Sequence, residues 1–498
     1  MRQIILLIFF SIIVRAFLPA GAPFTGDEGL YAQEIDEMLR DPSAYTTYMG
    51  EYVPWKPPLM FYVYSLSAKL VEPLNLPIEI VYRLPNYLFS ILTVVMFYLL
   101  TKNITKNEEV SFASALIFTT SPYLLVLNTL LMTDTLLICL LVISLFFYTN
   151  ENSKTKPYLF LIGGLFAGLA FLTKSIAALI VIPLVIAYYY LNNKTVFKQK
   201  IFWSSFVFIL FSILLSYTIF GKTWATQGLI DINRAFLVAD SDLKFILITI
   251  LGNLIIFFAM SLPWLPFCVG FLLNKKKKKI VNKNTQNFLL FWLIFLIFPF
   301  LVPGMLFWYV LPAVPAFIIL TAFSITGKEF DKMAKVMFLA LLIVSTVFSY
   351  MIAYDFSETK VRFTQKDMGE FLANKKNVAI ITYYASGLLY YKFHNETHQT
   401  FNDTLILFIT DPNNIPIEEL RNFVNNNQKI DDAHAINYLK GLYSAGFEKP
   451  IAIQGNQSLD IRYVVLDSQV PDYQRIVGDG FSLIYNNKRY YVYEKVSE

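Results

Sequence analysis

The residues best suited to chemistry lie in one short stretch near the N-terminus, between Phe24 and Leu59. It opens with the adjacent acids Asp27 and Glu28, and it ends with Lys56 followed by two prolines. Charge is costly to hold beside a membrane, so an acid pair directly after an apolar run is a functional-site candidate. The prolines restrict the backbone around Lys56 and fix the position of its charge. A carboxylate and a fixed lysine suit a base and a phosphate binder.

Composition indicates which elements must position these residues. Of the 498 residues, 56% are hydrophobic and only 15% are charged, whereas soluble domains are about 25% charged. A span needs roughly 20 apolar residues. We place about eleven spans, near 3–20, 86–101, 110–127, 131–149, 158–173, 175–191, 201–220, 245–272, 286–303, 305–325 and 333–353. The sequence therefore predicts a mostly α, polytopic membrane helical bundle over 1–353, with a first external loop at 21–85.

Lysine placement predicts the orientation of this bundle. If the N-terminus is cytoplasmic, every cytoplasmic connection carries lysine, as the positive-inside rule requires. The run Lys275–Lys279 fits a topology determinant better than a lipid or nucleic-acid patch, so no nucleic-acid partner is expected. The protein is expected in the cell membrane, in contact with the lipid bilayer. An odd number of spans then places residues 354–498 outside the cytoplasm.

These last residues differ in composition, being rich in Asn and in charge. Strand-like and helix-like runs alternate in them, which predicts a small extracytoplasmic α/β domain. The expected strands are Val378–Tyr383, Leu405–Ile409 and Tyr463–Leu466, the expected helices are Ile417–Asn425 and Asp432–Ala445, and a hairpin is expected from Phe481–Tyr485 and Arg489–Tyr493.

Under this topology the notable polar residues gather at the outer membrane face. They are Asp27, Glu28, Tyr31, Lys56, Arg83, Asp134, Lys174, Asn233 and Arg234. Cations there would bind a lipid-linked phosphate, and a carboxylate would take a proton from an attacking hydroxyl or amine. Together these groups describe sugar transfer from a polyprenyl-phosphate donor. The same groups could hold a lipid phosphate without chemistry, although the near-absence of ionisable residues within the spans argues against an ion-coupled transporter.

The sequence also resembles a known family at these residues. Its motifs occur in the family order, as Asp27-Glu28-x-x-Tyr31, Lys56-Pro57-Pro58-Leu59, Arg83-Leu84-Pro85, Thr133-Asp134, Gly168-Leu169-Ala170-Phe171-Leu172-Thr173-Lys174, Asn233-Arg234-x-Phe236, Pro263-Trp264 and Trp308-Tyr309-x-Leu311-Pro312. The chain resembles the GT-C transferases, in the branch of the dolichyl-phosphate-mannose–protein mannosyltransferases and the aminoarabinose lipid A transferases. The resemblance covers about residues 5–325 and implies a GT-C membrane fold.

The resemblance also implies roles for single residues. Asp27, accompanied by Glu28, matches the acid that activates the acceptor. Lys56 matches the lysine that meets the donor phosphate, with Arg83 and Lys174 as further phosphate contacts. Asp134 matches the acid of the second outer loop, which orders the acceptor or the first loop; Tyr31, Asn233 and Arg234 are placed with it.

Each of these residues also has a purely structural interpretation. Asp27 and Asp134 could cap the helices that follow them. Lys56 and Lys174 could be lysines that reach the membrane interface, and Arg83 could serve topology or capping. The chain departs from the family pattern at Lys174-Ser175-Ile176 and at Val302-Pro303-Gly304-Met305, where many members carry Lys-Gly-Pro and a polar Ser/Lys segment.

Cofactor needs are expected to be small. Both cysteines, Cys139 and Cys268, lie in apolar runs, which leaves no thiolate metal site. The three histidines, His394, His398 and His434, all lie in the C-terminal part, without the spacing of a zinc site. A divalent cation held by Asp27, Glu28 and Asp134, as in the oligosaccharyltransferase relatives, is the weaker alternative to no metal.

We therefore expect an inverting glycosyltransferase that uses a polyprenyl-phosphate-sugar donor and a protein, lipid or glycan acceptor outside the cytoplasm. One alternative is an oligosaccharide transferase or ligase of the same fold. The other is a non-catalytic transporter or scaffold for glycolipids, which would tolerate the loss of Asp27 and Glu28.

Overall fold

The computed structural model describes residues 1–24, 26–42, 46–48, 51–52, 56–218, 243–274, 281–295, 307–326, 332–357, 360–382, 386–394, 404–409, 417–426, 435–437, 451–455, 460–470, 473–478 and 480–496. The chain divides into two compact units. The first comprises Met1–Gly21, Pro54–Gly228 and Ala235–Phe356, and the second comprises Ala22–Val53, Leu229–Arg234 and Ser357–Glu498. Part of the expected first loop, with Asp27 and Glu28, thus groups with the C-terminal residues.

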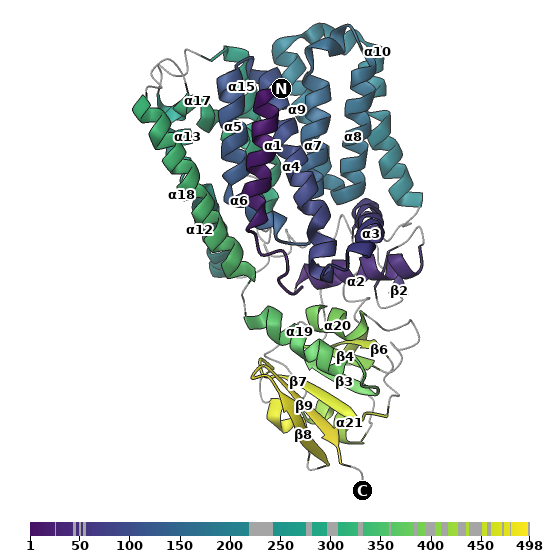
Figure 1. Cartoon of the computed structure of the whole chain (residues 1–498). Coiled ribbons are helices and arrows are strands. Elements are labelled where there is room, and N and C mark those ends of the chain that lie inside the picture. Colours follow the sequence, from purple (N-terminus) through teal and green to yellow (C-terminus); the bar gives the residue numbers. More distant parts are fainter. Residues whose placement is uncertain are drawn as a thin grey trace. The chain divides into compact units, whose positions relative to one another are not determined.

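The first unit is helical, and its long helices stand side by side (Figure 1). Its described elements are α1 (Arg2–Ala16), α3 (Leu59–Val71), η1 (Glu72–Leu74), α4 (Ile78–Thr105), α5 (Glu108–Thr120), α6 (Pro122–Asn128), α7 (Thr133–Thr149), η2 (Glu151–Lys154), α8 (Tyr158–Lys174), η3 (Ser175–Ile180), α9 (Val181–Asn192), η4 (Lys194–Lys198), α10 (Lys200–Ser204), α12 (Leu243–Ser261), α13 (Leu265–Leu273), α15 (Lys283–Ile294), η6 (Phe307–Ala313), α17 (Val314–Ile325) and α18 (Lys332–Ser357).

Several of these helices could cross a membrane. In the described part of the chain, four are long and apolar enough, namely Ile78–Thr105, Tyr158–Asn192, Lys200–Thr218 and Lys335–Asp355. Two bent pairs, Glu108–Thr120 with Pro122–Asn128 and Ile250–Ser261 with Leu265–Leu273, raise the number to six if each pair is one span. The expected count of eleven is therefore not confirmed, although apolar helices occupy most of the expected places.

The helix α4 is central to this unit, because α1, α3, α5 and α7 all pack against it. A buried cation joins α1 to α4, since Arg15 Nε donates to Ser90 Oγ at 2.5 Å. Just after α1, the Phe17 carbonyl oxygen accepts a hydrogen bond from the Tyr354 hydroxyl of α18 at 3.0 Å. These polar contacts between apolar helices fix how the helices sit against one another.

A close approach of backbones holds α8 in place. At Gly168, an added Cβ would lie 2.8 Å from the Phe208 carbonyl oxygen, and at Gly164 it would collide with the carbonyl oxygen of Ser205. Only glycine leaves room for such contacts. The register of α8 against the segment that follows α10 is therefore set by these glycines, and with it the position of Lys174 at the end of α8.

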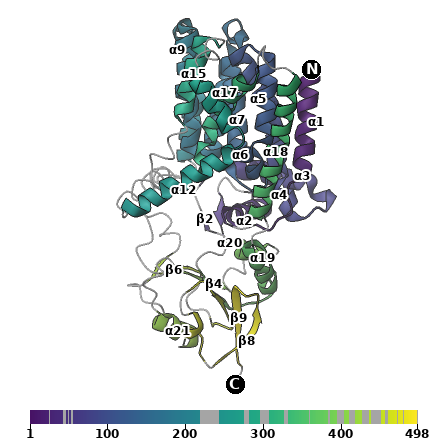
Figure 2. The same ribbon diagram turned by 90° about the vertical axis from the view of Figure 1, so that its left-hand side faces the viewer.

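The second unit is mixed α/β (Figure 2). Its described elements are α2 (Asp27–Arg40), β1 (Thr47–Tyr48), β2 (Glu51–Tyr52), α19 (Lys360–Leu372), β3 (Val378–Thr382), α20 (Ser386–Phe393), β4 (Thr404–Ile409), α21 (Ile417–Asn426), β5 (Ala435–Asn437), β6 (Ile451–Gly455), β7 (Tyr463–Asp467), η8 (Tyr473–Arg475), β8 (Phe481–Asn486) and β9 (Tyr490–Lys495).

Seven of its strands form one sheet in the order β5-β6-β4-β3-β7-β9-β8, and β1 and β2 form a separate antiparallel pair. The central strand β3 pairs in parallel with β4 and β7, and its residues are all buried, as expected of a parallel strand covered on both faces. On one face, Leu420, Phe423 and Val424 of α21 pack against apolar residues of β3 and β4. This packing gives the unit its own core.

One expected element of this unit is wrong. The segment Asp432–Ala445 is not a helix at Ala435–Asn437, which instead forms β5 and pairs in parallel with β6. The pairing supplies backbone hydrogen bonds from another part of the chain, and such tertiary contacts override local propensity. The other expected strands, the helix at 417–425 and the C-terminal hairpin all appear within one or two residues of their expected bounds.

Candidate functional site

Asp134 and Lys174 form a buried ion pair in the first unit. The Lys174 Nζ lies 2.6 Å from Asp134 Oδ1 and 2.7 Å from Oδ2. Both side chains are almost enclosed, with Asp134 2% exposed and Lys174 9% exposed. Lys174 is therefore not a lysine that extends to a solvated interface, and its charge is already neutralised by a carboxylate.

Helix geometry explains why these two residues meet. Asp134 lies in the first turn of α7 and Lys174 is the last residue of α8. The two helices pack antiparallel, with Ser144 of α7 donating to the Gly163 carbonyl oxygen at 2.7 Å. An acid at a helix start and a cation at a helix end are each stabilised by the helix dipole. The N-cap of α7 is Met132, so Asp134 is not the cap.

A third element reaches the same pair. The Nζ of Lys174 lies 5.0 Å from the ring centroid of Tyr309, in η6. A cation over an aromatic face is attracted by the ring, more strongly where water is excluded. Lys174 thus joins α7, α8 and the Trp308-Tyr309 segment, which the sequence had placed in separate motifs.

A polar network runs along α4 beside this pair. Arg83 is fully buried and donates from Nη1 to the Ala20 carbonyl oxygen at 2.8 Å. One turn further along, Asn86 accepts a hydrogen bond from the Tyr64 hydroxyl and donates to the carbonyl oxygen of Leu130. Because Leu130 lies just before α7, this network fixes the turn that presents Asp134.

Asn86 and Tyr64 were missed by sequence reasoning. Asn86 directly follows the Arg83-Leu84-Pro85 motif. A polar residue inside an apolar run, one helical turn after Arg83, is the feature of the sequence that could have identified it. Tyr64 lies on α3, the helix that begins after Lys56-Pro57-Pro58, and it is fully buried. Their contact links the lysine motif to the arginine motif through two helices.

Lys56 lies just ahead of α3. Pro58 is the N-cap of this helix, and the Pro58 carbonyl oxygen accepts from Tyr62 N at 3.1 Å. Proline suits the start of a helix because its missing N–H would have no partner there. Lys56 itself is half-buried, so a rigid proline pair fixes the point from which its side chain projects.

In the second unit, the two adjacent acids have different surroundings. Asp27 is the first residue of α2 and is exposed, whereas Glu28 is only 3% exposed. The N-cap is Gly26, with φ of 62°, so Asp27 is not the cap. Gly26 occupies a conformation that other residues rarely adopt, and it sets the direction in which the two acids leave the turn.

Glu28 is paired with an arginine that is distant from it in the sequence. Arg362 of α19 donates from Nη1 to Glu28 Oε2 at 2.5 Å and to the Pro23 carbonyl oxygen at 2.8 Å. Arg362 is 4% exposed. This pair separates the roles of the acids, because Glu28 neutralises a buried cation while Asp27 reaches solvent. No local pattern in the sequence pointed to Arg362.

Three predicted residues remain. Tyr31 is buried on α2, with 5% of its surface exposed. Asn233 and Arg234 lie outside the described residues. The structure thus brings Asp134 and Lys174 together in one unit and gives Glu28 an arginine partner in the other.

Metal ligands are not grouped in the part of the chain that the structure describes. No set of three or more His, Cys, Asp or Glu side chains there is arranged to hold a metal ion. Glu28 and Asp134 each pair with a buried cation, which competes with use of these carboxylates as ligands. His394 Nδ1 lies 2.9 Å from the Tyr390 hydroxyl, while residues 398 and 434 lie outside the described ranges.

Sequence comparison supports the resemblance drawn from the motifs. Residues 55–218 match the model of the dolichyl-phosphate-mannose–protein mannosyltransferase family. This range includes Lys56, Arg83, Asp134 and Lys174. A protein of Aquifex aeolicus (strain VF5), described only as uncharacterized, is 24% identical over 373 residues, which are 72% of this chain and 72% of that protein.

Solved structures share the fold over nearly the whole chain. ArnT from Cupriavidus metallidurans, bound to undecaprenyl phosphate, matches with a TM-score of 0.59 and 13% identity, over 99% of this chain and 98% of ArnT. The oligosaccharyltransferase of Archaeoglobus fulgidus, in complex with Zn and sulfate, matches with a TM-score of 0.57 and 14% identity, over 99% of this chain and 73% of that protein. The expected GT-C fold is thereby confirmed.

Proposed function

We propose that this chain, which has the GT-C fold, is an inverting glycosyltransferase using a polyprenyl-phosphate-linked sugar. The observation that carries the proposal is the family match over 55–218, which includes the buried Asp134–Lys174 pair and the lysine motif. The undecaprenyl phosphate in the ArnT structure supports a lipid phosphate as the carrier. The acceptor is a hydroxyl or amine on a protein, lipid or glycan outside the cytoplasm.

In this proposal Asp27 is the base. The acceptor oxygen or nitrogen attacks the anomeric carbon of the donor sugar, and its proton passes to the Asp27 carboxylate. The bond from the anomeric carbon to the phosphate oxygen breaks on the opposite side, which inverts the configuration. Its electron pair leaves with the polyprenyl phosphate. Exposure of Asp27 at the start of α2 supports this role, since a base must reach the acceptor.

Lys56 stabilises the charge that develops on the departing phosphate, with Arg83 as a further cation. A fixed cation is effective because it needs no reorganisation as the charge develops. The proline pair after Lys56 supports such preorganisation. Because its ammonium group is taken by Asp134, Lys174 is proposed to orient Asp134 and Tyr309 instead of binding the phosphate.

The test is a transfer assay with the full-length protein and a set of polyprenyl-phosphate sugars, in which release of polyprenyl phosphate is measured. We expect turnover for at least one donor and a loss of about 10²-fold or more in kcat for Asp27→Asn. Asp41→Asn is the matched control, because Asp41 is an exposed acid just past the other end of α2. Full activity of Asp27→Asn would remove Asp27 as the base.

The same assay separates the alternatives. Turnover of lipid-linked oligosaccharides, without turnover of single-sugar donors, would favour the oligosaccharide transferase. Glycolipid binding that is unchanged in Asp27→Asn, with no turnover of any donor by the unaltered protein, would favour the non-catalytic carrier.

A further inference from the structure

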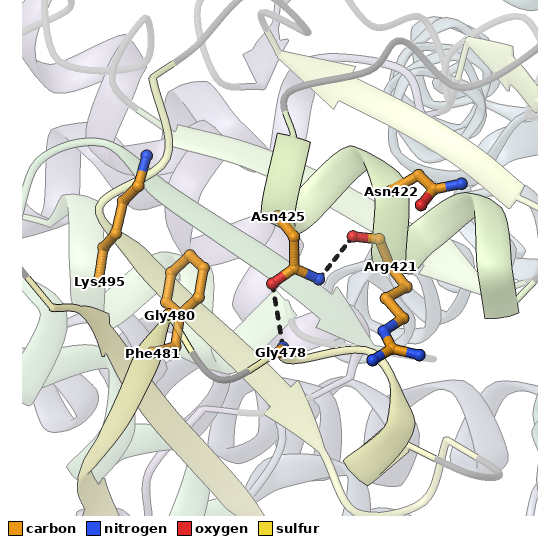
Figure 3. A pocket seen from close by; sticks show the side chains of 7 residues that line it. All are labelled: Arg421, Asn422, Asn425, Gly478, Gly480, Phe481 and Lys495. Atoms are coloured by element: carbon orange, nitrogen blue, oxygen red, sulfur yellow. Dashed lines mark hydrogen bonds between the residues drawn. The ribbon is translucent and has the colours of Figure 1, made fainter.

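A pocket lies in the second unit, between α21 and the β8–β9 hairpin (Figure 3). Its volume is about 340 Å³, within the range of about 300–1,000 Å³ for small-molecule sites. Its described lining residues are Arg421, Asn422, Asn425, Gly478, Gly480, Phe481 and Lys495. None of the motifs found in the sequence includes this surface.

One side of the pocket is held rigid by Asn425. Its Oδ1 accepts from Gly478 N at 3.0 Å, and its Nδ2 donates to the Arg421 carbonyl oxygen at 2.7 Å (Figure 3). The same Nδ2 lies 3.3 Å from the Ile476 carbonyl oxygen. The oxygen and the nitrogen of the Asn425 amide thus both contact residues that precede β8, and they join α21 to that turn. A ligand would meet a fixed wall here and not a mobile one.

The opposite side presents an aromatic ring beside a cation. Phe481 and Lys495 are directly paired across β8 and β9, so their side chains lie on the same face of the hairpin. The ring of Phe481 is half-buried and the ammonium of Lys495 extends beyond it (Figure 3). This pair offers a sugar-sized apolar surface next to a positive charge.

Charge is unbalanced around the pocket. Among its described lining residues there are two cations, Arg421 and Lys495, and no carboxylate. Lys495 has an exposed partner, Asp460, at 3.7 Å, which is a weak surface contact. The Arg421 guanidinium makes no ion pair with any residue in the described ranges, whereas the neighbouring Arg475 lies 3.6 Å from Glu418. Arg421 is therefore the cation best placed to take an anionic ligand.

We propose that this pocket binds an anionic sugar unit, with its carboxylate or phosphate on Arg421 and its ring against Phe481 beside Lys495. The planar guanidinium suits two parallel hydrogen bonds to either anion, and Asn422 adds a neutral amide for a hydroxyl. The choice of an anion rests on the pocket itself. The choice of a sugar rests on the proposed function, since a transferase acting on glycans would meet such units as part of its acceptor.

The proposal is tested by ligand-observed NMR with the full-length protein in detergent. The probes are glucuronic acid and glucose 6-phosphate, with glucose as the uncharged analogue and inorganic phosphate as the anion without a ring. We expect one or both anionic sugars to bind at least about 10-fold more tightly than glucose and inorganic phosphate. Preference for glucuronic acid identifies a carboxylate ligand, and preference for glucose 6-phosphate identifies a phosphate ligand.

Matched variants locate the binding. Arg421→Gln should weaken binding by about 10-fold or more, because it removes the charge and keeps an amide. Arg475→Gln removes a nearby exposed arginine outside the pocket and should leave binding unchanged. Gly480→Leu offers an independent variant, since a Cβ at Gly480 meets nothing within 4 Å, and its side chain should fill the pocket and abolish binding.

Two results would overturn the proposal. These are the absence of saturable binding of either anionic sugar, and equal weakening by Arg421→Gln and Arg475→Gln. If inorganic phosphate binds as tightly as the sugars, the proposal of a sugar ligand is wrong and the pocket is an anion site. Failure of transfer with every donor, together with pocket binding as described, would refute the proposed function without refuting the pocket.

Discussion

Lys174 and Asp134 are joined through both carboxylate oxygens of the aspartate, at 2.6 and 2.7 Å, although 40 residues separate them in the chain. The pair has a measurable consequence. Removing one partner leaves a buried charge uncompensated, which costs about 3–5 kcal/mol, whereas replacing both by apolar residues costs much less. Asp134→Leu and Lys174→Met should each lower the Tm of the detergent-solubilised protein, and the double variant should recover much of the loss.

An exposed pair supplies the control for this cycle. Lys102 Nζ lies 2.9 Å from Glu108 Oε1, with both side chains about half exposed. Lys102→Met should leave Tm unchanged, because solvent screens such pairs. Additive losses in the Asp134→Leu/Lys174→Met double variant would show that the two residues do not act as a pair.

Substitutions of the two acids at the start of α2 should affect different properties, stability for Glu28 and activity for Asp27. Glu28→Gln removes the Glu28 charge that pairs with the buried Arg362, so it should lower Tm in the way that Arg362→Gln does. Asp27→Asn should lower kcat by about 10²-fold or more and leave Tm unchanged, since Asp27 is exposed. Thermal denaturation and transfer assays on the same preparations test both statements; a reversed pattern would exchange the proposed roles.

Lys56 should matter in the transition state more than in binding. Lys56→Met is expected to lower kcat by roughly 10²-fold, as loss of one preorganised donor does, with a smaller change in KM. Lys69→Met is the matched control, being an exposed lysine in the last turn of α3, the helix that follows Lys56. An equal effect of the two substitutions on kcat would argue against a specific phosphate contact.

Glycine substitutions should change stability in opposite directions. Gly164→Ala places a Cβ against the Ser205 carbonyl oxygen and should lower Tm, because backbone must move. Gly252 lies inside α12, and an added Cβ there meets nothing within 4 Å. Gly252→Ala should raise stability by about 0.5–1 kcal/mol, since alanine restricts the unfolded chain. Equal changes would contradict the close approach at α8.

Tyr490 should lose its proton at a higher pH than an ordinary tyrosine. Burial raises the pKa of this tyrosine to about 12, above its ordinary value of 10.0. Its contribution to stability is complete below pH 10, where both states are protonated, and it is lost as pH rises through 10 toward 12, because only the unfolded state then releases the proton. The absorbance difference between the unaltered protein and Tyr490→Phe should therefore titrate near pH 12; a midpoint near 10 would contradict burial.

Some of this structure could be predicted from the sequence. Uniform apolar runs predicted helices such as α7 and α8, whose ends differ by at most two residues from those expected. The covered strands β3, β4 and β7 also came from continuous apolar runs bounded by polar residues. These elements can be predicted from local composition, because a buried helix or strand needs apolar residues along its length.

The partners in the site could not be predicted in the same way. The motifs placed Asp134 and Lys174 on one side of the membrane, but only the antiparallel packing of α7 and α8 shows that they pair with each other. Arg362 was missed because it lies 334 residues from Glu28, and no local pattern encodes so distant a contact. The strand β5 was missed for a related reason, since pairing with β6 determines it.

The distance between Glu28 and Arg362 along the chain has a consequence for biosynthesis. The acid leaves the ribosome 334 residues before the arginine does. At about 5–20 residues per second, this delay is on the order of tens of seconds. During that time α2 lacks the partner that neutralises Glu28. A chain that stops before α19 keeps Asp27 and every motif of the first unit, yet it lacks the arginine that pairs with Glu28 and donates to the Pro23 carbonyl oxygen. The Glu28–Arg362 pair can therefore form only after α19 has been translated.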